Sequence, residues 1–252
     1  MSNEKIIDTR RALFAGGARL NLVVAGIMYY VLAAAVPLTT AAIWTAVSHF
    51  IEPDEWLYTL SRVIDGALVL LFVMPLMYGF NTLAWRIYRD GSADTDCVFS
   101  AYRMLPRTWL VMLIQLIPAG LIASAVFMCI EAWRYIDGFS IMSRNSTVIT
   151  AVHAGLVVAC VLIVVLSFVL AVRLYLLQSY AYRGDMSVAD ALARSWSASR
   201  GQIRRIIGFV MRYIGWAVLG VLSVGVLLIY RVIPCYYIEY NIFADELLKG
   251  SK

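Results

Sequence analysis

Residues 206–248 constrain the fold more than any other part of this chain. They form an apolar stretch of about forty residues, and a basic, amphipathic segment, residues 183–205, comes directly before it. A helix crosses the apolar core of a bilayer with about 20 residues. The stretch is therefore too long for one crossing, and it predicts two crossings joined by a turn near residues 223–225.

The composition extends this interpretation to the whole chain. Hydrophobic residues make up 62% of the sequence and charged residues 15%, whereas about half of a typical soluble domain is apolar. The apolar runs are spread over almost the entire length, so only short loops remain and a separate soluble catalytic domain is excluded. We expect an all-α, polytopic membrane protein that forms a single transmembrane domain over residues 1–252.

Six apolar runs are each long enough to cross a membrane as a helix. The expected spans cover about residues 20–47, 63–87, 108–130, 148–177, 203–222 and 226–243. Four of them contain a proline: Pro37, Pro75, Pro118 and Pro234. Proline removes a backbone donor, so we expect broken or kinked helices whose freed carbonyls are satisfied by neighbouring groups.

The arginines predict the orientation. When the connections are assigned alternately to the two sides, nearly all cations fall on one side, and the other side receives only Arg62, Arg134 and Arg144. Cytoplasmic loops carry the excess of Lys and Arg, so both termini are expected in the cytoplasm of a cell-membrane protein. The net charge of +5 is explained by these loops, and nucleic acid is not an expected partner.

Two segments on the basic side have the same pattern of a turn, an acidic residue, an apolar stripe and an aromatic residue. Asp96, Val98 and Tyr102 in the first segment correspond to Asp190, Leu192 and Trp196 in the second. Amphipathic segments of this kind lie in the membrane interface, so we expect two cytoplasmic interfacial helices, the second with Ser187 as its N-cap. The similarity indicates either a weak duplication of spans two and three by spans four and five, or convergent amphipathic design.

No catalytic or metal-binding pattern is present in the sequence. The four cysteines are scattered singly, and neither His49 nor His153 has a carboxylate or cysteine at helical spacing. The motifs of serine hydrolases, zinc peptidases and nucleotide-binding proteins do not occur. We therefore expect no catalytic residue, no metal and no cofactor, and the chain is not expected to be an enzyme.

Polar residues inside the expected spans are the first group of candidate site residues. Charges within a membrane are costly and usually face a partner or a cavity. The candidates are Arg212, Arg231 and Glu239 in the last two spans and Gln115 in the third. Arg212 and Glu239 lie at similar depths, so an ion pair between them is possible. Such a pair either lines a substrate or ion pathway or simply neutralises its two charges.

The second group of candidates is the basic interfacial segment. It contains Trp196 and four arginines, Arg194, Arg200, Arg204 and Arg205. Cations near a membrane surface attract anionic headgroups by about 1 kcal/mol each. The same arginines would also serve ordinary topology determination, so lipid binding and topology both remain open for them.

Several segments resemble a known family. The stretches YLLQSYAYRGDMSVADALARSW and RIIGFVMRYIGWAVLGVLSVGVLLIYRVIPCYY are similar to the C-terminal signature of a bacterial integral-membrane family, domain-of-unknown-function family 975, and MYGFNTLAWRIYRDGSADTDCVFSAYR resembles its upstream signature. That family is itself similar to the membrane domain of some glycerophosphodiester phosphodiesterases. Val226 and the Pro234-Cys235-Tyr236 segment depart from the family pattern. The resemblance implies a helical membrane protein without an established activity.

Two functions follow as expectations. The first is a non-enzymatic membrane module that interacts with membrane lipids, with a partner membrane protein or with a second copy of the chain. The second is a small transporter or channel component with a cavity between the proline-containing helices, because broken helices commonly surround transport sites. A water-accessible cavity that reaches Arg212 and Glu239 would favour the second function.

Overall fold

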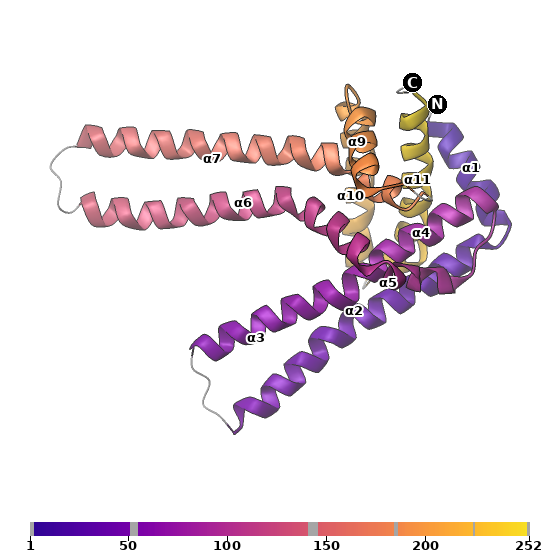
Figure 1. Cartoon of the computed structure of the whole chain (residues 1–252), viewed down its shortest axis with the longest axis horizontal. Coiled ribbons are helices and arrows are strands. Elements are labelled where there is room, and N and C mark those ends of the chain that lie inside the picture. The colour runs from indigo at the N-terminus through magenta and orange to yellow at the C-terminus, as the bar shows by residue number, and fades with distance from the viewer. Residues whose placement is uncertain (1–2, 51–54, 141–145, 184–185, 224, 251–252) are drawn as a thin grey trace.

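Three helical hairpins diverge from one compact region in the computed structural model (Figure 1). The structure describes residues 3–50, 55–140, 146–183, 186–223 and 225–250, and every regular element within them is a helix. The predicted all-α class is confirmed. Each hairpin has an outgoing leg and a returning leg, and both described ends of the chain lie beside the compact region.

The first hairpin follows a short N-terminal helix. That N-terminal helix is α1 (Asn3–Ala15). The hairpin itself consists of α2 (Ala18–Ser48), α3 (Glu55–Leu68), the π-helical turn η1 (Val69–Val73) and α4 (Met74–Asp90). The sequence did not predict α1. Gly17 joins α1 to α2 with φ +86°, a left-handed backbone conformation that glycine adopts without a steric penalty. α1 can therefore fold back toward the last helix of the chain.

The second hairpin begins with two short helices. Its elements are the 3₁₀-helix η2 (Thr95–Phe99), α5 (Ser100–Arg103), α6 (Leu105–Ser140), α7 (Ser146–Leu174) and α8 (Leu177–Ala181). The first expected interfacial helix is thus two short helical pieces rather than one helix. The fourth expected span also differs from the structure, because its helix ends at Leu174 and α8 begins only after a turn.

The third hairpin is formed by the apolar C-terminal stretch. Its elements are α9 (Val188–Ala198), α10 (Ile203–Leu222), the π-helical turn η3 (Leu228–Val232) and α11 (Ile233–Gly250). The chain reverses where the sequence predicted a turn: Gly225 has φ +80°, and its N–H donates to the carbonyl of Gly220 at 3.0 Å. A Cβ on Gly220 would lie 2.8 Å from Leu228, so the two legs pack closely beside this reversal.

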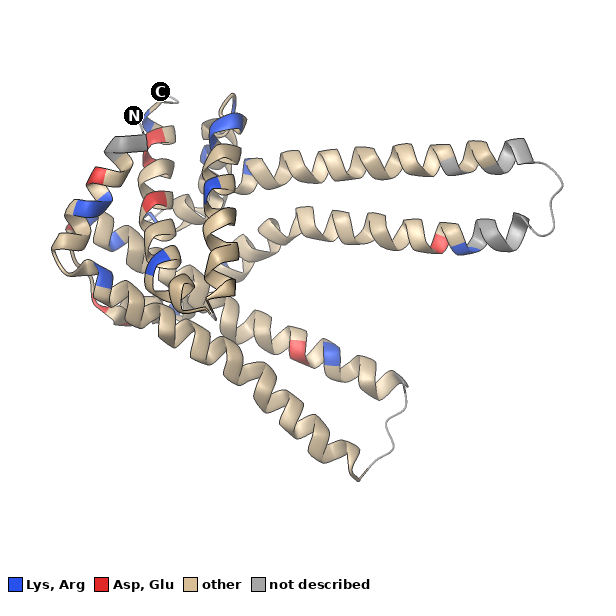
Figure 2. Cartoon of the chain, turned by 180° about the vertical axis from the view of Figure 1, so that it is seen from behind, with Lys and Arg blue, Asp and Glu red and all other residues tan. Residues whose placement is uncertain are grey.

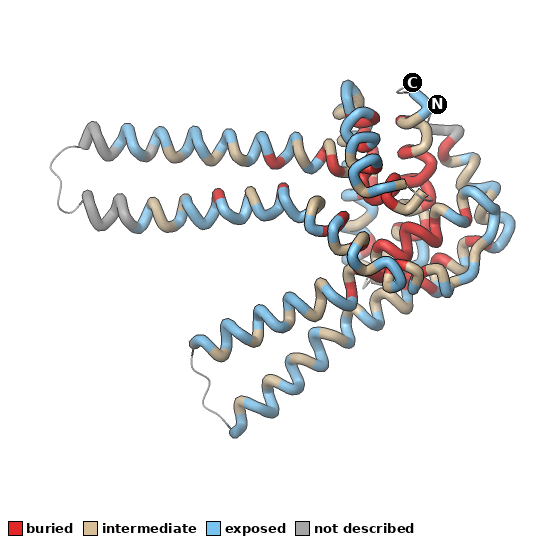
Figure 3. The backbone as a smooth tube through the Cα atoms, in the orientation of Figure 1, coloured by how far each residue is buried: buried red, intermediate tan, exposed pale blue. Residues whose placement is uncertain are grey.

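Buried residues concentrate where the hairpins meet (Figure 3). We call this region the hub; it consists of α1, α4, η2, α5, α8, α9, α11 and the adjoining ends of α2, α6, α7 and α10. The remaining parts of the three hairpins are called the arms. The hub contains fully buried residues from all three hairpins, including Leu22, Leu83, Tyr180 and Ile242. The arms expose most of their large apolar side chains.

Among the residues that the structure describes, five helical segments are long and apolar enough to cross a membrane. They are Ala18–Ser48, Trp56–Asp90, Leu105–Arg134, Thr150–Ala181 and Ile203–Leu222. Only 11% of the most apolar window of Thr150–Ala181 is buried within the protein. A surface of this kind is suited to lipid rather than to water. The last expected span, 226–243, is not among these five segments.

The prolines do not all break their helices. α2 and α6 are assigned as continuous helices through Pro37 and Pro118, although α6 bends in the half that contains Pro118 (Figure 1). Pro75 and Pro234 each follow a π-helical turn by two residues. An inserted π turn rearranges the backbone bonds that proline cannot complete, so the helix continues through these two positions.

Candidate functional site

Glu239 is the centre of an ion-pair cluster in the hub. Its side chain is 2% exposed, and its two carboxylate oxygens accept hydrogen bonds from Arg10 and Arg212. The structure thus brings together the predicted pair of Arg212 on α10 and Glu239 on α11. The guanidinium side chains of Arg10 and Arg212 are only partly buried, so both cations remain close to the protein surface.

Arg10 is a functional candidate that the sequence analysis missed. It lies one helical turn after Ile6, which is buried, and shortly before Leu13 and Phe14, which pack against the core. Residues three or four apart share one face of a helix, so this spacing was the available signal. The partner itself lies 229 residues away in the sequence, and no local pattern indicates it.

A cavity of about 200 Å³ adjoins this cluster. Residues of α1, α10, η3 and α11 line it: Ile7, Arg10, Arg212, Tyr213, Trp216, Arg231, Val232, Cys235 and Glu239. We call it the arginine pocket. Three guanidinium groups and one carboxylate face it among the described residues, so positive charge is in excess. This excess distinguishes the pocket from a neutral ion pair.

Arg231 lies at the exposed side of the arginine pocket. Its guanidinium carbon lies 5.1 Å from the ring centroid of Trp216, a distance at which a cation is attracted to an aromatic ring. Trp216 is 40% exposed. The pocket can therefore be reached from the side where Arg231 and Trp216 meet the surroundings.

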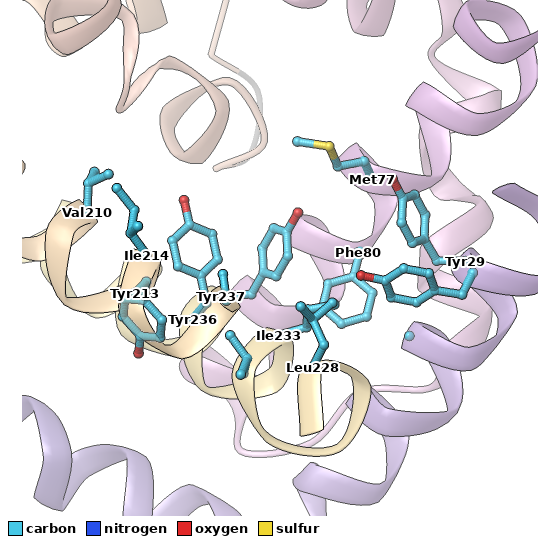
Figure 4. Close-up of a pocket in the computed structure, with 14 residues that line it drawn as sticks. Tyr29, Met77, Phe80, Val210, Tyr213, Ile214, Leu228, Ile233, Tyr236 and Tyr237 are labelled. Carbon is cyan, nitrogen blue, oxygen red and sulfur yellow. The ribbon is translucent and has the colours of Figure 1, made fainter. Parts of the chain in front are cut away.

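A second, larger cavity of about 390 Å³ lies beyond the wall formed by Tyr213 and Val232, which line both cavities. Its lining is apolar apart from tyrosine hydroxyls, and it comes from α2, α4, α10, η3 and α11. In Figure 4 the hydroxyl of Tyr213 points away from the direction taken by those of Tyr236 and Tyr237. The larger cavity is suited to hydrocarbon rather than to charged groups.

Gln115 has a structural contact for each end of its amide. Tyr78 donates a hydrogen bond to its Oε1 at 2.7 Å, and its Nε2 lies 3.5 Å from the carbonyl oxygen of Leu174. The residue therefore links α6 to α4 and α7. The structure places Gln115 apart from Arg212, Arg231 and Glu239, because it lines neither of the two cavities described above.

Polar residues from the returning legs of all three hairpins meet at the centre of the hub. Asn241 donates to Asn81 at 2.8 Å, and Ser179 donates to Asn241 at 3.0 Å. We call Asn81, Ser179 and Asn241 the polar centre; each is at most 1% exposed. Buried polar groups stabilise a fold only when they are hydrogen-bonded, and here each bond joins two different hairpins.

Arg183 forms a second buried ion pair close to the polar centre. Its Nη1 lies 3.0 Å from Asp245, and its guanidinium lies 4.1 Å from the ring centroid of Trp85. Burial lowers the pKa of Arg183, and the carboxylate of Asp245 opposes that shift. This pair fixes α11 against the end of the second hairpin. In the sequence, Arg183 is only the first charge of the basic segment 183–205.

The basic interfacial segment presents its candidates to the outside. Arg194, Trp196, Arg200, Arg204 and Arg205 are all exposed, and we call these five residues the base surface. Ser187 caps α9 as predicted, accepting a hydrogen bond from the N–H of Asp190. α9 lies across the inner end of α7, where Arg173 donates to the carbonyl of Trp196. Arg205 also lies 3.6 Å from Glu246.

Charged residues are distributed unevenly over the molecule. Figure 2 shows most Lys and Arg around the hub, whereas the arms carry few charges. Within the described part of the chain, no group of three or more His, Cys, Asp or Glu residues is placed to hold a metal ion. The side chain of His153 lies outside the described residues.

Comparisons with known proteins identified no relative of this chain. Neither a scan against protein-family models, nor a search of curated proteins, nor a search of solved structures gave a match. The resemblance to the family of unknown function therefore stays an expectation from the sequence.

Proposed function

We propose that this chain is a non-enzymatic membrane module whose base surface binds anionic lipid headgroups. In this proposal all three hairpins cross the cell membrane, so that α10 and the η3–α11 helix provide the fifth and sixth crossings. Both termini and the base surface then lie on the cytoplasmic side, whereas α4 and α11 of the hub also extend into the membrane. The observation that carries the proposal is the exposure of four arginines and Trp196 directly beside arms that are apolar and unburied.

The charges of the last helix are compatible with a sixth crossing because each has a specific contact. Glu239 is paired with two arginines, Asp245 is paired with Arg183, and Arg231 stacks on Trp216. Paired charges facing the protein interior are tolerated in membrane helices. From Leu228 to Gly250 the helix is about 35 Å long at 1.5 Å per residue, which is enough for the apolar core of a bilayer.

The base surface is suited to an anionic membrane surface in both composition and position. Arginine donates several hydrogen bonds to phosphate oxygens in a planar arrangement, and tryptophan prefers the headgroup region. Exposed cations near the membrane contribute about 1 kcal/mol each to the attraction of anionic lipids. Arg205 is expected to contribute less than the others because Glu246 lies close to it.

Lipid composition around the purified protein tests this proposal. The protein is reconstituted with equal amounts of phosphatidylglycerol and phosphatidylcholine, extracted with mild detergent, and the retained lipids are quantified by mass spectrometry. Replacing Arg200, Arg204 and Arg205 by Gln should reduce the enrichment of phosphatidylglycerol severalfold. The control replaces Arg11, Arg62 and Arg134 by Gln, which removes the same charge away from the base surface. Equal enrichment in the two triple variants would contradict the proposal.

A transporter or channel component is the second candidate. The observation that favours it is the arginine pocket, a cavity that reaches Arg212 and Glu239 between the legs of the third hairpin. Glu239→Gln would abolish transport by such a component. If a transported solute is identified and its flux in proteoliposomes is unchanged in Glu239→Gln, this second function is contradicted.

A further inference from the structure

The arginine pocket has more positive than negative charge at a position close to apolar surroundings. Glu239 is its one carboxylate among the described lining residues, and both carboxylate oxygens already accept from Arg10 and Arg212. Arg231 therefore adds a positive charge that no further carboxylate among the described lining residues balances. Arg231 stacks on Trp216 but forms no ion pair among the described residues, and such a cation is still costly beside a lipid-facing helix. A bound anion would reduce this cost.

The pocket has the size and the access that a phosphate group requires. Its volume of about 200 Å³ is several times the ~30 Å³ that one water molecule occupies in the liquid. Three guanidinium groups converge on it from α1, α10 and η3. Guanidinium groups bind phosphate oxygens through paired, charge-assisted hydrogen bonds. The exposed Arg231 and Trp216 form the side through which such a group enters.

An apolar track leads away from the pocket along α10. Trp216 and Leu219 follow Arg212 at helical spacing, so the three residues share one face of the helix. Trp216 is 40% and Leu219 51% exposed. A ligand with its anion in the pocket would therefore place an attached hydrocarbon chain against an apolar surface.

We propose that the arginine pocket binds the phosphate of one anionic phospholipid, with Arg231 as the entrance contact and the acyl chains along Trp216 and Leu219. This site is distinct from the base surface, where many headgroups exchange over exposed arginines. The proposal rests on the proposed function only in requiring that the third hairpin lies in the membrane. It adds a single, stoichiometric lipid to the general attraction of the hub for anionic headgroups.

Native mass spectrometry of the detergent-purified protein tests the proposal by counting bound lipids. Phosphatidylglycerol and phosphatidylcholine with identical chains are titrated separately. The wild type should bind one phosphatidylglycerol more tightly than any further molecule, and phosphatidylcholine should show no such first step. Arg231→Gln should weaken this first step about tenfold, the loss expected for one charge-assisted contact.

Arg62→Gln is the matched control for Arg231→Gln. Arg62 is also an exposed helical arginine, and its guanidinium also lies 5.1 Å from an aromatic ring centroid, that of Tyr58. The first lipid-binding step should be unchanged in this control. An equal loss in the two variants, or no loss in Arg231→Gln, would overturn the proposal.

Protection of Cys235 gives an independent readout without any change to the arginines. Cys235 lines the pocket, and the other three cysteines, Cys97, Cys129 and Cys160, are replaced by Ser. Phosphatidylglycerol should slow the modification of Cys235 by a small maleimide, whereas phosphatidylcholine should not. Inorganic phosphate at millimolar concentration is the third probe. Protection by inorganic phosphate equal to that by phosphatidylglycerol would contradict a lipid ligand and indicate a soluble anion.

The outcomes separate this proposal from the proposed function. If the base surface variant with Arg200, Arg204 and Arg205 replaced keeps the tight first step but loses general enrichment, both proposals hold. If that variant keeps the general enrichment while Arg231→Gln loses the first step, only the base surface proposal fails. If the first step is absent in the wild type, only the pocket proposal fails.

Discussion

The hub and the arms are built from the same kind of helix, yet different interactions hold them in place. Side chains in the hub are buried, and its helices are joined by ion pairs and hydrogen bonds between residues far apart in the sequence. The arms bury little of their surface, and most polar side chains there bond to their own helix, as Thr45, Ser61 and Ser124 do. The arms therefore present an apolar surface that suits lipid better than water, whereas the hub carries its own specific contacts.

Glycine substitutions should produce the largest difference between the two regions. A Cβ on Gly79 in α4 would lie 1.7 Å from the backbone oxygen of Val98, whereas a Cβ on Gly120 in α6 meets nothing within 4 Å. We expect Gly79→Ala to lower the free energy of unfolding by about 3 kcal/mol, because backbone must move to accommodate it. Gly120→Ala should be neutral or stabilising. Denaturation of both variants in the same detergent measures the contrast.

The two glutamate pairs give the next contrast. Glu239 is buried and pairs with two arginines, whereas Glu131 in the second arm pairs with Arg134 on its own helix at an exposed site. Glu239→Gln should cost about 2 kcal/mol, less than a fully buried pair because both of its arginines are partly exposed. Glu131→Gln should change stability by less than about 0.5 kcal/mol. Equal losses in SDS unfolding titrations would show that the hub pair has no special role.

Two serines sharpen the comparison at the smallest scale. Ser179 donates to Asn241 and accepts from Arg183 in the polar centre, whereas Ser124 bonds only the carbonyl of Leu121 among the contacts described for it. Ser179→Ala should cost about 1.5 kcal/mol because it leaves buried polar groups without this partner. Ser124→Ala should have almost no effect. SDS unfolding titrations of the two variants measure this difference. A larger loss of stability for Ser124→Ala than for Ser179→Ala would contradict the contrast between the hub and the arms.

The arms were predictable because they depend on composition and length. Apolar runs of about 20 residues directly indicate helices that are long and apolar enough to cross a membrane, and the turn before Gly225 follows from the excess length of the last run. The candidate pair of Arg212 and Glu239 was also predictable, since both residues lie at matching depths of one hairpin. These predictions needed only local spacing and the thickness of a bilayer.

The hub was harder to predict because its contacts join distant segments. The pairing of Arg10 with Glu239 and that of Arg183 with Asp245 need the third hairpin to be placed against the others. One sequence pattern shared by the three hairpins does indicate the hub. The segments NTLA at Asn81, QSYA at Gln178 and NIFA at Asn241 each place an amide three residues before an alanine. All three alanines are fully buried in the hub.

The central claim is that three hairpins leave one hub and return to it across a single membrane. Single cysteines in a variant without the native four test this claim most directly: His49→Cys and Val226→Cys lie near the ends of the first and third arms, and Ser92→Cys and Gly250→Cys lie at the hub. We expect an impermeant maleimide to label the first two from one face of the membrane and the last two from the other. Labelling of Val226→Cys from the same face as Ser92→Cys would contradict the third hairpin's two crossings.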